Sequence, residues 1–114
     1  MENIYKKQNK DLRTNTVTTW YSVPSNSRAI VKSILVCDDT NNGSDITVDL
    51  FDGDPASANK FTIFKNKAIA GNATEQLLSE PLIMQESEVL QVTAADANRL
   101  HVVASILEIN REDK

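Results

Sequence analysis

The 114-residue sequence contains a single cysteine and a single histidine. One cysteine excludes an intrachain disulfide framework, and one histidine leaves almost no material for a histidine-rich metal site or a Cys–His nucleophile pair. Three glycines are too few for a loop that cradles phosphate. Apolar runs reach only four or five residues, so we expect no transmembrane helix and no membrane partner. The polar start, MENIYKKQNK, is not expected to act as a secretory signal.

The net charge of −4 is unevenly distributed along the chain. Residues 1–13 carry four basic and two acidic side chains, or 4 − 2 = +2, which leaves −4 − 2 = −6 for the remaining 101 residues. A basic head on an acidic body suits nucleic acid, an acidic neighbouring protein or a second copy of the chain. Because two acids dilute the four cations, we favour a protein partner and expect no binding to nucleic acid.

Short segments rich in β-branched and aromatic residues recur every 10–15 residues, with turn residues between them. They predict seven or eight strands, at 16–23, 28–37, 46–50, 60–65, 74–78, 81–84, 88–94 and 99–109. No sustained helical period appears, although a short helix at 94–99 competes with a turn there. The sequence therefore predicts an all-β fold, a single antiparallel β-sandwich of jelly-roll or Greek-key type.

Several strands indicate which face is buried. Ile46, Val48 and Leu50 alternate with polar residues, and Phe61 and Ile63 share one face of their strand. The last strand carries an apolar stripe at alternate positions: Leu100, Val102, Ala104 and Ile106. Residues 34–37 are continuously apolar, which predicts a central strand covered on both sides, in part by a neighbouring subunit.

The first residues differ from this pattern. Ile4 and Leu12 are the only strong aliphatic residues of segment 1–13, with Tyr5 beside them, so the segment cannot bury itself. It is expected to be a disordered arm or an extended strand that pairs with something else. The resulting division is an N-terminal arm (1–15), a sandwich domain (16–110) and a charged C-terminal tail (111–114).

Candidate chemical sites are few. The loop 38–43 alternates oxygen ligands as a calcium loop does, but the twelfth position is Asp49 instead of glutamate, which favours a polar hairpin loop. The Asp49–Asp54 turn is a second acidic cluster, where calcium is an alternative to a plain polar turn although nothing in the spacing requires it. His101 and Cys37 are interpreted as an ordinary surface or interface histidine and a buried thiol. We therefore expect no catalytic residues, no metal and no cofactor.

The order of segments over residues 16–109 resembles small virion structural proteins of tailed bacteriophages. The resemblance rests on Tyr21-Ser22-Val23-Pro24, the stretch from Ala29 to Ile34, the Asn41–Ser44 loop and the alternating strand from Ile46 to Leu50. In the second half it rests on residues 81–84, 87–94 and 102–109. The resemblance implies a β-sandwich present in many copies on the particle, as a head decoration, neck or tail accessory protein, with no catalytic residues to transfer.

These observations favour a non-enzymatic component of a tailed-phage virion, assembled in the host cytoplasm. Its expected partners are other virion proteins (capsid, neck or tail subunits) and further copies of itself. Contacts are expected through the arm and the sheet edges, and the candidate arm residues are Ile4, Tyr5, Lys6, Lys7, Lys10 and Arg13. The alternative is a carbohydrate-binding sandwich used in host adsorption, with Trp20, Tyr21 and the Asp49–Asp54 cluster as its candidates.

Overall fold

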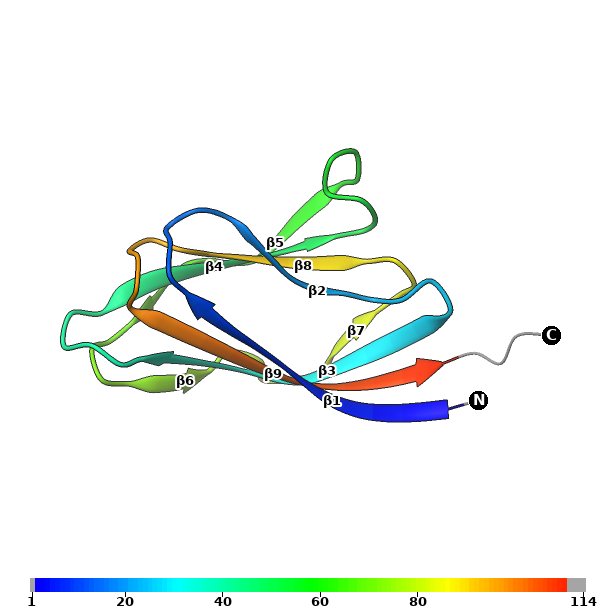
Figure 1. Ribbon diagram of the computed structural model, residues 1–114, viewed down its shortest axis with the longest axis horizontal. Coiled ribbons are helices and arrows are strands. Elements are labelled where there is room, and N and C mark those ends of the chain that lie inside the picture. The colour runs from blue at the N-terminus through cyan, green and yellow to red at the C-terminus, as the bar shows by residue number, and fades with distance from the viewer. Residues whose placement is uncertain (1, 111–114) are drawn as a thin grey trace.

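The computed structural model describes residues 2–110, which form nine antiparallel strands in two sheets packed face to face (Figure 1). The strands are β1 (Glu2–Leu12), β2 (Thr18–Ser22), β3 (Ser27–Asp38), β4 (Ser44–Phe51), β5 (Lys60–Ile69), β6 (Thr74–Gln76), β7 (Leu82–Met84), β8 (Val89–Ala94) and β9 (Leu100–Asn110). The predicted β-sandwich is confirmed. The charged tail expected at 111–114 lies outside the described residues.

We call the two layers sheet A and sheet B. Sheet A has the order β1-β9-β3-β6, and β7 also pairs with β3. β6 and β7 lie along the same edge of β3, where β7 pairs with residues 29–31 and β6 pairs with residues 35–37. Sheet B has the order β2-β8-β4-β5. β1 and β2 therefore form one side of the sandwich, while β5 lies at the opposite edge of sheet B, and the β4–β5 hairpin projects beyond the body (Figure 1).

The core lies between the sheets and follows the period-two patterns. Ile46 and Val48 are fully buried, Leu50 packs partly buried against them, and the stripe on β9 is at most 2% exposed. In the central strand β3, Ile34 and Val36 face the core, whereas Leu35 between them is 40% exposed. The described residues thus leave the outer side of β3 uncovered at Leu35, at the place where a neighbouring subunit was expected.

Trp20 and Tyr21 are adjacent yet both buried, at 3% and 4% exposure. Neighbouring residues of a regular strand point to opposite faces. Here the β2–β8 register shifts between Thr19 and Tyr21, so Trp20 is an extra residue in the pairing. This bulge turns both aromatic side chains towards the core.

Residues 2–12 are not a separate arm in this structure but the edge strand β1. β1 pairs with β9 without a register break, from Glu2 opposite Asn110 to Leu12 opposite Leu100. The pairing supplies the backbone partners that the segment was expected to seek elsewhere, and Leu12 is buried in the core at 3% exposure. Over the described residues 2–12, β1 is therefore part of sheet A.

One smaller expectation differs from the structure. β5 continues through residues 66–69, beyond the strand expected at 60–65, and Asn66 takes a left-handed φ of 50° within it. Residues 95–99 form a turn, the alternative to the short helix there, and the Asn98 N–H donates to the Leu12 carbonyl at 3.0 Å. Gly43, in the β3–β4 connection, has a positive φ of 76°. Among residues 2–110 no helix is suited to crossing a membrane.

Candidate interaction surfaces

β1 alternates in a way that explains why it was difficult to place from the sequence. Its inward-facing positions are half-buried or buried: Ile4, Lys6, Gln8, Lys10 and Leu12. Three of these five residues, Lys6, Gln8 and Lys10, are polar. Its outward-facing positions are exposed: Asn3, Tyr5, Lys7, Asn9 and Asp11. A strand whose inner face is mostly polar requires polar partners inside the sandwich.

The first such partner is Glu108 on β9, which is 2% exposed. Lys6 Nζ donates to Glu108 Oε2 at 3.0 Å, and the Tyr21 hydroxyl donates to the same oxygen. Because an unpaired buried carboxylate is strongly destabilising, these two donors are what allow Glu108 to remain inside. Burial and the neighbouring Glu108 carboxylate raise the pKa of Tyr21 well above its ordinary value of 10.0.

The second partner is Trp20 on β2. Gln8 Nε2 donates to the Trp20 carbonyl at 3.2 Å, and Trp20 Nε1 donates to the Gln8 carbonyl at 3.3 Å. This reciprocal pair joins β1 to sheet B across the side of the sandwich. β1 is therefore fixed by side-chain contacts to both sheets as well as by its pairing with β9.

The structure divides the six expected arm residues into two groups. Ile4, Lys6 and Lys10 face inward, and Lys6 is already paired with Glu108. Tyr5 and Lys7 lie on the exposed face of β1, with Tyr5 75% exposed. Arg13 follows the strand and forms an exposed ion pair with Asp11 at 3.2 Å.

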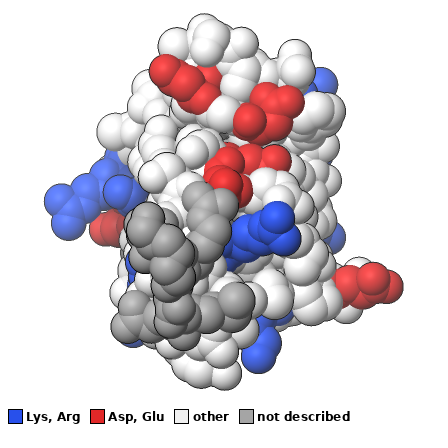
Figure 2. Space-filling model, turned by 90° about the vertical axis from the view of Figure 1, so that its right-hand side faces the viewer, with Lys and Arg blue, Asp and Glu red and all other residues white. Residues whose placement is uncertain are grey.

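The second edge of β1 carries no strand within residues 2–110. An open edge presents unpaired backbone N–H and C=O groups that can pair with another chain. The start of β1 and the end of β9 lie at one end of the sandwich (Figure 1), and lysine and arginine side chains lie mostly around the lower part of that end, whereas acidic side chains lie mostly in its upper part (Figure 2).

The outer face of sheet A carries a line of apolar side chains across four strands, which we call the apolar row: Tyr5, Leu107, Ile30 and Ile83. Each member lies directly opposite the next in the strand register. Tyr5 and Ile83 are 75% and 56% exposed, and the other two are partly exposed. Opposed side chains on one face contact each other, so the row is continuous.

The outer face of sheet B has no equivalent of this row. The corresponding line across its four strands is polar: Thr19, Gln91, Asp49 and Thr62. Gln91 Nε2 donates to Thr19 Oγ1 at 3.2 Å, and Thr62 Oγ1 donates to Asp49 Oδ1 at 2.7 Å. This line satisfies its own hydrogen bonds and is suited to contact with water.

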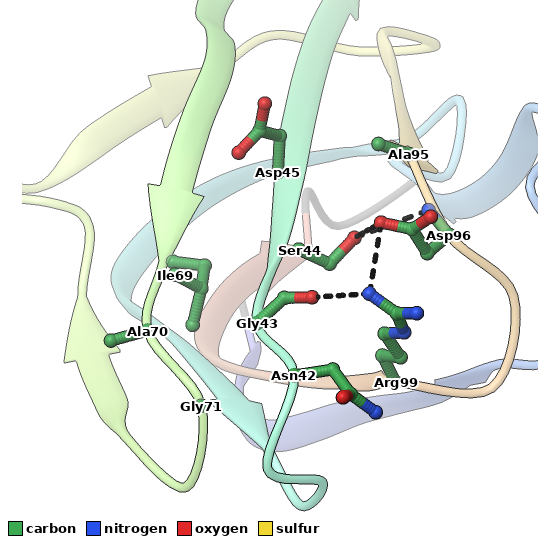
Figure 3. A pocket seen from close by; sticks show the side chains of 10 residues that line it. All are labelled: Asn42, Gly43, Ser44, Asp45, Ile69, Ala70, Gly71, Ala95, Asp96 and Arg99. Carbon is green, nitrogen blue, oxygen red and sulfur yellow. Dashed lines mark hydrogen bonds and ion pairs between the residues drawn. The ribbon is translucent and has the colours of Figure 1, made fainter.

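A polar hollow of about 420 Å³ lies where the β3–β4, β5–β6 and β8–β9 connections meet (Figure 3). Arg99 Nη1 donates to the Gly43 carbonyl at 2.8 Å and faces Asp96 Oδ2 at 3.4 Å. Asp96 also accepts from Ser44 Oγ at 3.0 Å, while Asp45 points away from this pair. The charges of Arg99 and Asp96 neutralise each other, and their hydrogen bonds connect the β3–β4 and β8–β9 loops.

The acidic turn considered for calcium uses its oxygens locally. Asp52 accepts from the Asn59 backbone N–H at 2.9 Å and from its amide at 3.2 Å, and Asp54 accepts from Ala56 N at 3.0 Å. Asp49 is bound to Thr62, as described above. Within the described part of the chain, no three His, Cys, Asp or Glu side chains are grouped so that they could hold a metal.

His101 has partners that its local sequence does not reveal. Its Nε2 lies 3.2 Å from Asp11 Oδ1 on β1 and 3.7 Å from Asp39 Oδ2 in the β3–β4 connection. Cys37 lies opposite it in the β3–β9 register and is partly buried. Asp11, His101 and Cys37 lie opposite one another on the outer face of sheet A, and we call them the polar row.

Glu108 is a buried charged residue that reasoning from sequence did not identify. A signal was present, since Glu108 continues the alternate positions of Leu100, Val102, Ala104 and Ile106 on β9. Because alternate residues of a strand face the same side, the alternation that buries those side chains also buries the Glu108 carboxylate. Its partner Lys6 lies 102 residues away, so no local pattern joins the two.

No known family model matches the sequence, and no curated protein matches it. Solved structures match by fold. A chain from the Bacillus endospore appendages, described as disulfide-linked pili, aligns with 96% of this chain and 89% of its own, with a TM-score of 0.58 and 13% identity. A chain from the acid-stable capsid of Helicobacter pylori bacteriophage KHP30 aligns with 94% and 87%, with a TM-score of 0.55 and 16% identity.

A chain from the T13 particle of infectious bursal disease virus aligns with 93% of this chain but only 30% of its own length, with a TM-score of 0.58 and 10% identity. This chain therefore corresponds to one part of that larger protein. At such low identities the three likenesses show a shared all-β sandwich fold.

Replacing Lys6 by methionine should destabilise the domain, because Glu108 then loses its cation and stays buried. We expect the free energy of unfolding, measured by urea denaturation at pH 7, to fall by roughly 1–3 kcal/mol. The matched control, Lys7→Met on the exposed face, should change it by less than about 0.5 kcal/mol. K6M combined with Glu108→Gln should recover most of the loss. Equal effects of K6M and K7M would contradict the assignment.

Tyr21 should make stability fall at high pH. Its raised pKa keeps the hydroxyl protonated in the folded state, so the hydrogen bond to Glu108 contributes fully below pH 10.0. Above that pH the unfolded chain loses the proton first, and the free energy of unfolding decreases. Urea denaturation at pH 8 and 11 should show a smaller decrease for Tyr21→Phe than for wild type. Tyr5→Phe is the matched control and should keep the wild-type decrease; an unchanged decrease in Y21F would refute this role.

Proposed function

We propose that this chain is a non-enzymatic structural subunit of a virus particle, specifically a head decoration or cement protein, or a neck or tail accessory protein, of a tailed bacteriophage. Its partners in this proposal are other virion proteins and copies of itself. The function requires binding by surface complementarity and no reaction at a catalytic centre.

The extent of the fold match is the observation that carries the proposal. The sandwich that aligns with a phage capsid chain takes up 94% of this chain and 87% of that one. A chain of the Bacillus endospore appendages, described as pili, has a similar fold and is also part of an assembly. The segment order over residues 16–109 points in the same direction, because it resembles small virion proteins of tailed phages.

The open edge of β1 is the proposed docking site on neighbouring subunits. A neighbour's strand added there would complete the backbone hydrogen bonds of sheet A. Tyr5, Lys7 and Arg13 are exposed along this edge and would contact the neighbour, in part through salt-sensitive attraction to acidic surface. Ile4, Lys6 and Lys10 hold the strand in place from the inner side.

The carbohydrate-binding alternative loses its aromatic candidates in this structure. Trp20 and Tyr21 are buried in the core and offer no stacking platform. The oxygens of the Asp49–Asp54 turn accept hydrogen bonds from neighbouring loop and strand groups. No observation in the described residues therefore favours sugar binding over a structural role.

The particle itself tests this proposal. Virions purified on a density gradient from a host that expresses the full chain with an affinity tag should contain it at many copies per particle, as counted by quantitative mass spectrometry. Presence in the lysate together with absence from intact particles would contradict the proposal.

The β1 edge is tested in the same preparation with Lys7→Glu combined with Arg13→Glu. Reversing both charges should lower incorporation severalfold while thermal unfolding stays close to wild type, because exposed charges contribute little to stability. The matched control, Lys65→Glu with Lys67→Glu on β5, makes the same change of net charge in sheet B, away from the β1 edge. A similar loss in both double variants would show that net charge, and not the edge, is responsible.

A further inference from the structure

We infer that copies of this chain associate head to tail, with the β4–β5 hairpin of one copy docking on the apolar row of the next. The docking element, which we call the tip, consists of the loop Asp52–Asn59 and Phe61. This inference rests on the two surfaces alone and does not require the proposed function.

The apolar row is the receiving surface. It crosses β1, β9, β3 and β7, which at about 4.8 Å between strands gives a band about 14 Å long. Two exposed cations on β3 flank it: Arg28 lies on one side, and Lys32 lies on the other, where a bulge turns both Lys32 and Ser33 outward. The surface therefore offers apolar contact together with positive charge.

The tip has the complementary character. Phe61 is 53% exposed at the outer end of β5, beyond the core. Asp52 and Asp54 are exposed beside it, with Lys60 as the nearest cation, so the tip carries an aromatic ring and a net negative charge. The hairpin projects clear of the body (Figure 1), where a neighbouring molecule can reach it.

The tip is also ordered before any contact is made. Asp52 is bound to Asn59 through its backbone N–H and both carboxylate oxygens. The Asp54 carbonyl accepts from the N–H groups of Ser57 and Ala58, at 2.9 and 2.7 Å. A pre-organised loop loses less conformational entropy on binding than a mobile one, which favours docking of a small element.

Two-fold pairing of sheet A with sheet A fits these surfaces less well. Row against row would bring the cations of both copies together, which is repulsive. A shifted pairing would place the row on the polar row of Asp11, His101 and Cys37, six residues or about 20 Å along β9. The first arrangement covers the apolar row but brings like charges together, and the second covers it with polar side chains. The tip instead offers the row both an aromatic ring, from Phe61, and negative charge.

A head-to-tail contact has a consequence for assembly. Each copy has one tip and one row, so every copy can bind two others, and the result is a closed ring or an open filament. The contact is small, so we expect weak association that becomes strong when many copies are linked.

Two single substitutions at exposed positions test the inference in the full chain. Phe61→Lys removes the ring from the tip and adds a cation that the row repels, and Ile83→Glu places an acid in the row. Sedimentation velocity over a concentration series should show self-association of wild type and an association constant at least about tenfold lower for each variant. Val17→Glu, at a 55% exposed apolar position outside both surfaces, is the matched control and should associate like wild type.

An equimolar mixture of the two variants distinguishes the docking mode. F61K retains an intact row and I83E retains an intact tip, so the mixture should form one-to-one dimers and nothing larger. A mixture that stays monomeric, a V17E variant that also fails to associate, or wild type that is monomeric up to millimolar concentration would overturn the inference. A wild-type protein that is monomeric yet present in virions would contradict this inference and support the proposed function. A wild-type protein that self-associates yet is absent from virions would contradict only the proposed function.

Discussion

Backbone pairing along both sides of β9 is the constraint on which the rest of the structure depends. β1 and β3 bond to β9 over the same stretch, so its eleven residues keep one face inward from end to end. That regularity carries Glu108 into the interior with the apolar stripe, and the buried carboxylate then requires Lys6 from β1 and the Tyr21 hydroxyl from sheet B. The pairing of β9 thus buries the Glu108 carboxylate, and the bond from Lys6 to that carboxylate helps to hold the edge strand β1 in place.

Most of the sandwich could be predicted from the sequence because strand alternation and turn residues are local signals. β1 could not, since Lys6, Gln8 and Lys10 occupy inward positions where a buried strand normally has apolar side chains. The partner of Lys6, Glu108, lies 102 residues away, and Trp20 meets Gln8 at the bulge in β2. The expectation that a neighbouring subunit covers the outer side of β3 was local too, and Leu35 is exposed there. The apolar row needed the register between strands, which one sequence does not contain.

The two faces of the sandwich divide the surface into a side suited to water and a side suited to contacts. Sheet B presents polar side chains that satisfy one another, as the Thr62–Asp49 hydrogen bond illustrates. Sheet A presents the apolar row and the open edge of β1, both of which lack a covering within the described residues. A subunit that lies on an assembly through sheet A and turns sheet B outward would use both features.

A cryo-electron microscopy map of the intact particle, at a resolution that separates β-sheets, tests the structural role most directly. We expect repeated sandwich density in which sheet A, with the β1 edge and the apolar row, faces neighbouring subunits, while the outer face of sheet B, apart from the tip at its β4–β5 end, faces solvent. A map without this density, or one in which sheet A faces solvent and sheet B makes the contacts, would contradict this expectation.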